Sequence, residues 1–142
     1  RQLVFEISIK GVKVKDVMNE EIVTVTQSIS LESLVEHYFM KYRFSRFPVI
    51  DNVDSQKIIG VISIHDVKAF PKDEWNEISV GQVVKSISDQ EIINIDAEIS
   101  DAIKQMTKHN LGHLVVMTGK KLIGMITKSD VMNYIQFYTE LH

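Results

Sequence analysis

One phrase of eight residues occurs twice in this chain. Residues 60–67 read Gly-Val-Ile-Ser-Ile-His-Asp-Val, and residues 124–131 read Gly-Met-Ile-Thr-Lys-Ser-Asp-Val. Each copy is typical of a glycine turn, a short apolar strand, a Ser or Thr, and a helix with an Asp in its first turn. Such a strand brings a hydroxyl and a carboxylate to a helix start, where backbone N–H groups point outward.

The Ser63-x-x-Asp66 and Thr127-x-x-Asp130 patterns allow two interpretations. Each is a capping box, in which the two side chains satisfy the unpaired N–H groups of a helix start. Each also suits a nucleotide, because a hydroxyl and N–H groups fit a phosphate, and a carboxylate one turn later fits the paired hydroxyls of a ribose. Capping does not require the same strand before the box or a second copy, so a longer repeat favours the binding interpretation.

The repeat extends over most of the chain. Its matched segments are 14–18 with 80–84, 22–25 with 92–95, 44–50 with 111–117, and the phrase above. Between the second and third segments both copies have the i, i+3, i+4, i+7 stripe of a half-buried helix, formed by Leu31, Leu34, Val35, Tyr38, Phe39 and Tyr42 in one copy and by Ile99, Ala102, Ile103 and Met106 in the other. Each repeat is therefore predicted to be β-α-β-β-α and roughly sixty residues long.

One repeat of this size buries too little surface to be stable alone, whereas two repeats packed through their sheets would share a core. The chain has 142 residues, of which 44% are hydrophobic, and this is enough for one such core. We therefore predict an α/β (α+β) module of two β-α-β-β-α repeats with pseudo-twofold symmetry. Its expected parts are an N-terminal lead-in (1–12), a first repeat (13–70), a linker (71–79) and a second repeat with an extended C-terminal helix (80–142).

Composition excludes several classes of protein. The chain has no cysteine, and therefore no disulfide framework and no thiolate metal site. No apolar run approaches the ~20 residues of a membrane span. The net charge of -3 argues against non-specific nucleic-acid binding, which needs a basic surface. We expect a soluble cytoplasmic domain and, because the chain starts at Arg1, a piece of a longer protein.

Motifs for catalysis are not found. The chain has no glycine-rich dinucleotide loop, no phosphate loop and no His-Glu-x-x-His. His109 and His113 have the spacing of two metal ligands on a helix, but Asn110-Leu111-Gly112 between them is typical of a helix end. His109 is better interpreted as a cation at a helix C-terminus. We therefore predict no enzymatic activity, no catalytic residue and no metal site.

The order and repetition of these segments resemble the CBS-domain family, named after cystathionine β-synthase. The matches include Val17-Met18, Phe47-Pro48-Val49, Gly60, Gly124 and both boxes. The resemblance implies a pair of repeats with two clefts between them that bind AMP, ADP, ATP or S-adenosylmethionine as regulatory ligands, with no cofactor required. It also implies dimerisation through helices, and the apolar residues of the last helix predict a homodimer.

By this resemblance the two boxes become matched binding sites. Asp66 and Asp130 would bind ribose hydroxyls, and Ser63 and Thr127 would face phosphates. A cation on the middle strand would reach a phosphate, and the adenine would lie against residues of the preceding strand. These residues are Arg46, Ile22, Val23 and Thr24 in the first cleft, and His113, Ile92, Ile93 and Asn94 in the second. Because histidine is a weaker, pH-dependent cation, we expect the first cleft to be the better site for a charged nucleotide.

Three further segments give a narrower resemblance. The aromatic-rich stretch 38–49, the joint 70–75 and the lead-in 11–18 are similar to the CBS pair appended to site-2-protease-like intramembrane zinc metalloproteases. This implies attachment to a membrane-embedded protease that lies outside this chain. Two interpretations remain open: a regulatory module that senses adenine nucleotides, and a structural or dimerisation module whose clefts are empty or occluded.

Overall fold

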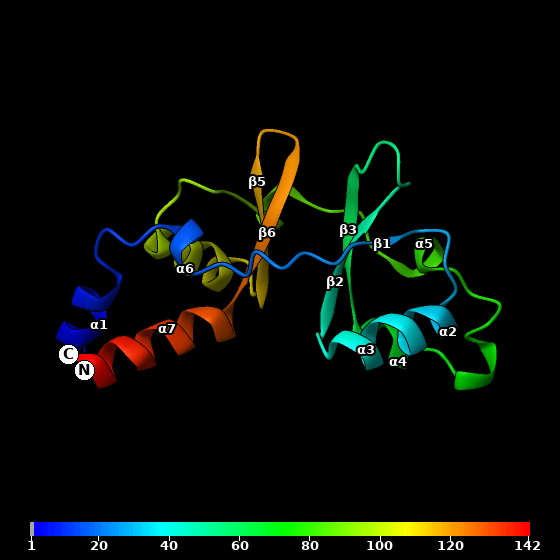
Figure 1. Cartoon of the computed structure of the whole chain (residues 1–142), viewed down its shortest axis with the longest axis horizontal. Coiled ribbons are helices and arrows are strands. Elements are labelled where there is room, and N and C mark those ends of the chain that lie inside the picture. Colours follow the sequence, from blue (N-terminus) through cyan, green and yellow to red (C-terminus); the bar gives the residue numbers. More distant parts are fainter. Residues whose placement is uncertain (1) are drawn as a thin grey trace. The chain divides into compact units, whose positions relative to one another are not determined.

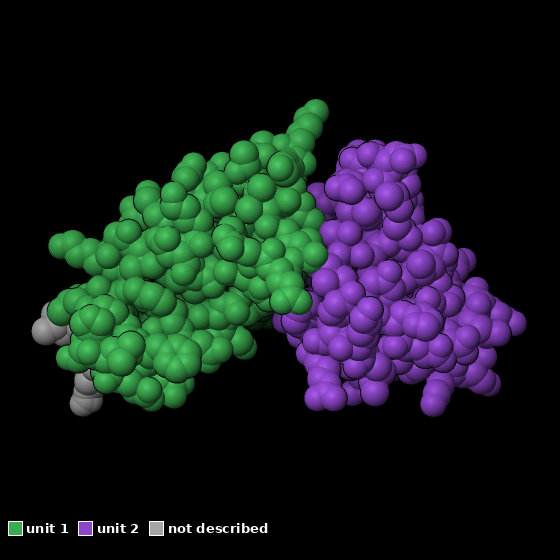
Figure 2. Space-filling view, in the orientation of Figure 1, with its two compact units in different colours: residues 1–22, 88–142 green, residues 23–87 purple. Residues whose placement is uncertain are grey.

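A computed structural model describes residues 2–142, with side chains described from Phe5 onward. The chain forms two compact units, coloured separately in Figure 2. Unit 1 contains the residues up to Ile22 together with 88–142, and unit 2 contains residues 23–87. Each unit has a three-stranded sheet and helices. The predicted mixed α+β class, with the β-α-β-β-α order in both repeats, is confirmed.

Unit 2 is built from the first repeat. Its sheet has the order β1-β2-β3, with β1 (Val25–Thr26) parallel to β2 (Arg46–Ile50) and β2 antiparallel to β3 (Ile58–Ser63). The helix between β1 and β2 has three parts, and a second helix follows β3 (Figure 1). The remaining elements are α2 (Leu31–Leu34), the π-helix η2 (Val35–Phe39), α3 (Met40–Tyr42), α4 (Ile64–Lys68), η3 (Lys72–Glu74) and α5 (Val80–Val83).

The core of unit 2 is rich in aromatic rings. Phe47 on β2 has no exposed surface, and its ring lies 5.7 Å from Tyr38, 5.2 Å from Phe39 and 6.2 Å from Tyr42 between ring centroids. These three residues belong to η2 and α3, so the predicted apolar stripe of this helix faces the sheet. The helix ends at Arg43, which has the left-handed conformation (φ 60) that is common just after a helix.

Unit 1 is built from the second repeat and the N-terminal segment. Its sheet has the order β4-β5-β6, with β4 (Ile92–Asn94) parallel to β5 (His113–Thr118) and β5 antiparallel to β6 (Lys121–Thr127). Helices α6 (Ile99–Lys108) and α7 (Lys128–Leu141) pack on this sheet, and α1 (Gln2–Ile9) packs against α7 (Figure 1). Two short 3-10 turns complete the unit, η1 (Val14–Asp16) and η4 (Asp89–Glu91).

The expected helix end between the two spaced histidines is confirmed. Helix α6 stops at Lys108, His109 is its C-cap residue, and Asn110 has φ 52. His113 is already in strand β5. The two imidazoles therefore do not share a helix face, which removes the geometric basis for a metal pair.

Each unit also contains the first segment of the other repeat. These exchanged lead-ins are residues 14–18 and 80–84. Residues 14–18 begin the first repeat but lie in unit 1, where the Val14 N–H donates to Ala97 O at 2.8 Å and the Asn19 N–H donates to Met125 O at 2.8 Å. The corresponding residues 80–84 lie in unit 2, where the Val80 N–H donates to Ile29 O at 2.8 Å. The two repeats therefore exchange these lead-ins. The compact units have other bounds than the repeats 13–70 and 80–142, which remain a prediction.

The glycine of each repeated phrase lies inside a strand, which corrects the expected glycine turn. Gly60 is in β3 and Gly124 is in β6. A Cβ atom at Gly60 would lie 2.3 Å from Lys85 O, and one at Gly124 would lie 2.7 Å from Asn19 O. Both positions need glycine because an exchanged lead-in passes directly over the strand.

Among residues 2–142, no helix has both the length and the apolar character needed to cross a bilayer.

Candidate functional site

Both Ser/Thr-x-x-Asp boxes form reciprocal caps in the structure. At the start of α4, the Ser63 N–H donates to Asp66 Oδ2 at 2.8 Å and the Asp66 N–H donates to Ser63 Oγ at 3.3 Å. At the start of α7, the corresponding bonds join Thr127 and Asp130 at 2.9 Å and 3.1 Å. The capping interpretation therefore holds at both positions. These bonds use one oxygen of each carboxylate, so capping leaves Oδ1 of both aspartates uncommitted.

Strand register brings the predicted cation next to each box. Arg46 is paired directly with Ser63 across β2 and β3, and His113 is paired directly with Thr127 across β5 and β6. Directly opposite residues of antiparallel strands point to the same face of the sheet, with Cβ atoms about 4.5–5.5 Å apart. A hydroxyl, a carboxylate and a nitrogen base are thus grouped at the same strand end in both units.

The grouped side chains lie on the sheet face away from the core of their unit. In β2, Phe47 and Val49 belong to the core beneath the helices, so by alternation Arg46 points to the opposite face. In β5, Leu114 and Val116 belong to the core of unit 1, which places His113 on the opposite face as well. The grouped side chains of each site therefore lie on the sheet face opposite the helices of their own unit.

The residues predicted to line the adenine differ between the two units. In unit 1, Ile92, Ile93 and Asn94 form β4. Ile93 is 6% exposed and belongs to the core, so only its backbone remains for a ligand. Asn94 Oδ1 accepts a hydrogen bond from the Asp96 N–H at 2.8 Å.

The equivalent segment before β1 is divided between the units. Val23 and Thr24 belong to unit 2, and the side chain of Val23 packs against its core. Ile22 belongs to unit 1.

A side-chain contact between His113 and Glu91 distinguishes the second site from the first. His113 Nε2 lies 3.1 Å from Glu91 Oε2, and the two side chains are only 14% and 19% exposed. Among the described side chains of unit 2, residues 23–87, Arg46 takes part in no ion pair. Glu91 carries no signal in the sequence, because an acid before an apolar strand is common and only the fold shows which base it faces.

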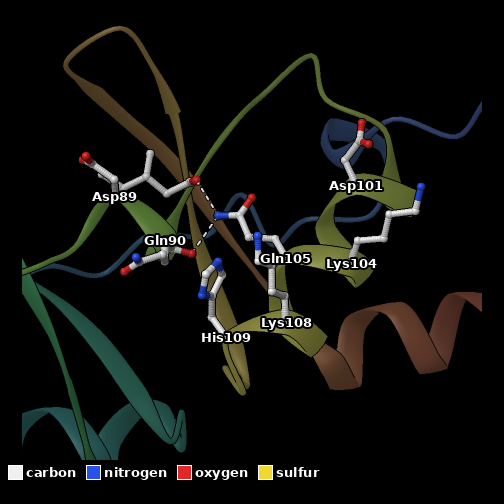
Figure 3. A pocket seen from close by; sticks show the side chains of 8 residues that line it. Asp89, Gln90, Asp101, Lys104, Gln105, Lys108 and His109 are labelled. Carbon is white, nitrogen blue, oxygen red and sulfur yellow. Dashed lines mark hydrogen bonds between the residues drawn. The ribbon is translucent and has the colours of Figure 1, made fainter.

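A surface pocket of about 440 Å³ lies beside the second site, between η4 and α6. Its residues are mostly charged or polar and comprise Asp89, Gln90, Ile92, Asp101, Lys104, Gln105, Lys108 and His109. Gln105 forms one wall, because its side-chain amide donates to Gln90 O at 2.7 Å and to Ile92 O at 2.8 Å (Figure 3). Of the predicted site residues, Ile92 lines this pocket.

Among the residues that the structure describes, no group of three or more His, Asp or Glu side chains is placed to hold a metal ion.

Comparison with known proteins gives a consistent family. The sequence pattern of the CBS domain matches residues 14–73 and 80–136. An uncharacterized protein of Methanocaldococcus jannaschii is 34% identical over 131 residues, which are 90% of this chain and 41% of that protein. A zinc metalloprotease of the same organism is 27% identical over 123 residues, which are 87% of this chain and 32% of that protein. The chain therefore spans less than half the length of these relatives.

The fold is also found among solved structures. The CBS domain of a bacterial CNNM/CorC family Mg2+ transporter, solved in complex with ATP, superposes with a TM-score of 0.81. The match covers 94% of each chain at 19% sequence identity. At this identity the likeness concerns the fold.

Proposed function

This chain belongs to the CBS-domain family, and on that premise we propose that it binds adenine nucleotides and transmits their binding to an attached protein. Its tandem CBS domains make it a regulatory module without a catalytic function of its own. The proposed ligands are AMP, ADP, ATP or S-adenosylmethionine, bound as regulators. The ATP complex of the transporter's CBS domain, which has the same fold, supports this class of ligand.

The observation that carries the proposal is the grouping of Arg46, Ser63 and Asp66 in unit 2. Arg46 is paired with Ser63, the cap residue of α4, across β2 and β3. A guanidinium with several donors suits a phosphate, and the uncommitted oxygen of Asp66 suits ribose hydroxyls. The same arrangement of His113, Thr127 and Asp130 makes the unit 1 site the second candidate.

Regulation would follow from a difference in affinity between two states of the module. A ligand shifts such an equilibrium only as far as its affinities for the two states differ, and the effect is reciprocal. The metalloprotease relative and the lead-in of this chain favour a metalloprotease as the attached protein. We propose that this protease is embedded in a membrane, with the present module on its cytoplasmic side, where adenine nucleotides are available.

Thermal stability with each ligand tests the proposal. A ligand at 100 times its dissociation constant should stabilise the protein by about 2.7 kcal/mol, which raises the melting temperature by roughly 2–8 °C. If AMP, ADP, ATP and S-adenosylmethionine all leave the melting temperature unchanged at millimolar concentration, the structural or dimerisation interpretation is favoured instead.

Two carboxylate variants then identify the site. Asp66→Ala and Asp130→Ala each remove one proposed ribose ligand, and calorimetry should show affinity falling at least tenfold in the variant whose site is used. Asp54→Ala is the control, because this exposed carboxylate lies in the loop between β2 and β3 and belongs to neither box. If both box variants bind as tightly as the parent, the site assignment is wrong.

We further propose that the chain forms a homodimer through α7. This helix leaves Met132, Phe137 and Leu141 exposed at 63%, 60% and 78%, and burying such side chains is the usual driving force for association. Light scattering at tens of micromolar should report a dimer that Phe137→Glu weakens. Val53→Glu, at a loop residue that is 69% exposed, should leave the dimer intact. A parent chain that is monomeric at this concentration contradicts the proposal.

A further inference from the structure

The two sites carry different charge, and the difference resides in Glu91. We propose that Glu91 determines ligand choice at the unit 1 site: it excludes phosphate there and selects an adenine nucleoside whose 5′ substituent carries no negative charge. This inference rests on the proposed function, since it presumes that both boxes bind adenine ligands. Unit 1 would therefore prefer an adenine ligand without a phosphate, whereas unit 2 would prefer one that carries a phosphate.

Glu91 already contacts Nε2 of His113, the nitrogen that a phosphate would bind. His113 is directly opposite Thr127, and its Nε2 lies 3.1 Å from Glu91 Oε2. A phosphate approaching this nitrogen would have to displace the carboxylate or lie beside it. Two anions in one place repel each other, and burial reduces the screening by water that would otherwise weaken the repulsion.

Glu91 is held in this position by a second set of contacts. Its other carboxylate oxygen, Oε1, accepts from the Ser88 N–H at 3.2 Å and lies 3.4 Å from Ser88 Oγ. These bonds form the capping box of η4. Because both oxygens are engaged and the side chain is 19% exposed, moving the carboxylate aside would break its contacts with Ser88 and His113. An incoming anion therefore meets a fixed negative charge.

Unit 2 presents the opposite charge at the equivalent position. Arg46 replaces His113 and, within residues 23–87, has no ion-paired acid. The glutamate that corresponds to Glu91 in the repeat is Glu21, which is exposed and belongs to the other compact unit. The two sites are thus expected to differ in kind: a phosphate-bearing ligand in unit 2 and a neutral or cationic one in unit 1.

Calorimetry with AMP and adenosine as a matched pair tests the inference. The whole chain is used with Asp66→Ala, which silences the unit 2 site and leaves the unit 1 site to be measured. In this background adenosine should bind at least tenfold more tightly than AMP. Adding Glu91→Gln should raise the affinity for AMP at least tenfold and leave the affinity for adenosine within about twofold, because glutamine keeps an oxygen for Ser88 but removes the charge.

Two further variants separate charge from structure. Glu21→Gln, at the equivalent repeat position, should leave the ratio of AMP to adenosine affinity within about twofold. Glu91→Gln together with His113→Arg gives unit 1 the charges of unit 2, and this variant should prefer AMP. Circular dichroism and a melting temperature equal to that of the parent show that each variant is still folded.

The outcomes distinguish this inference from the proposed function. If the parent chain binds neither adenosine nor any adenine nucleotide, both fail. If the parent binds nucleotides but the Asp66→Ala chain binds neither probe, or prefers AMP, the inference about unit 1 fails alone. It also fails if Glu91→Gln weakens or strengthens both ligands equally, since Glu91 would then have only a structural role.

Discussion

The two units use the same order of strands and helices around cores of different chemistry. In unit 2 the centre is Phe47, surrounded by the rings of Tyr38, Phe39, Tyr42 and Phe44. At the equivalent position of unit 1 is Leu114, also fully buried, in a core without a buried aromatic ring among its described residues. The helix over the aromatic core contains a π-helical turn, whereas α6 over the aliphatic core is a regular α-helix. The strand pattern therefore fixes the architecture, and the helix adapts to the size of the side chains beneath it.

The largest expected effect comes from removing the centre of each core. Phe47→Ala should destabilise unit 2 by about 4 kcal/mol and Leu114→Ala should destabilise unit 1 by about 3 kcal/mol, because each leaves a cavity in a closely packed interior. Denaturant titration provides the measurement. The single tryptophan, Trp75, packs on the core of unit 2, so its fluorescence reports that unit, while circular dichroism reports both.

The two signals decide how independent the units are. Phe47→Ala should lower the midpoint of the fluorescence transition more than Leu114→Ala does. If both variants shift the midpoints of the fluorescence and circular-dichroism transitions by the same amount, the two cores unfold together. The difference in their chemistry would then not give the units separate stabilities.

A smaller effect is expected at the glycines beneath the exchanged lead-ins. Gly60→Ala would place a Cβ 2.3 Å from Lys85 O and 2.6 Å from Val84 Cγ2, and Gly124→Ala would place one 2.7 Å from Asn19 O. Because a backbone carbonyl cannot move aside as a side chain can, we expect losses of about 3 and about 2 kcal/mol, respectively.

Urea unfolding measures both glycine variants. Gly119→Ala is not a suitable control because its φ of 57 adds backbone strain, so an exposed residue such as Ser86→Ala serves instead. Stabilities equal to that of the parent would mean that the lead-ins do not pass over the strands as described.

The smallest effect concerns the loops between the last two strands of each unit. In unit 2, Asp51 accepts from the Ser55 hydroxyl and from the N–H groups of Asn52 and Lys57. The Ser55 hydroxyl is the main cause that lowers the pKa of Asp51 below its ordinary value of 3.8, with the backbone bonds adding to it. The corresponding turn of unit 1, residues 118–120, has no carboxylate.

Asp51 should therefore make the stability of unit 2 depend on pH. A carboxyl whose pKa is lower in the folded state stabilises the protein above the unfolded value, and that contribution disappears as the pH falls through the folded value. Asp51→Asn should reduce stability at pH 7, and the difference from the parent should shrink below about pH 3.8. Urea unfolding of the parent and the variant at pH 7 and below about pH 3.8 measures this difference in stability, with Asp54→Asn as the control. A difference that is constant with pH would contradict the assignment.

The sequence was sufficient to predict the repeated elements and the caps, because these depend on neighbours along the chain. Ser63 with Asp66, and Thr127 with Asp130, satisfy each other within one helical turn, so spacing alone predicts the contact. The pairing of Arg46 with Ser63 was also within reach, since it follows once the two strands are recognised as a hairpin.

The rest depends on contacts between distant segments. Gly60 was expected at a turn, because nothing in the neighbouring residues shows that Lys85 passes over it. Glu91, in η4, was missed because its partner, His113, lies 22 residues away on strand β5. The exchange of lead-ins has no local signature, since residues 14–18 and 80–84 have the same pattern and would fit either repeat equally well by sequence.

The exchange of lead-ins also determines how the molecule would respond to mechanical force. Unit 2 is one continuous stretch of chain, residues 23–87, inserted between two stretches that together make unit 1. Both described ends of the chain belong to unit 1, where α1 packs against α7. Tension applied through these ends would load unit 1 first and would reach unit 2 only after the lead-in at Val14–Asp16 had been pulled from the β4-β5-β6 side of the fold. If an attached protein pulls on the ends of this chain, unit 2 would therefore bear no tension until unit 1 has opened.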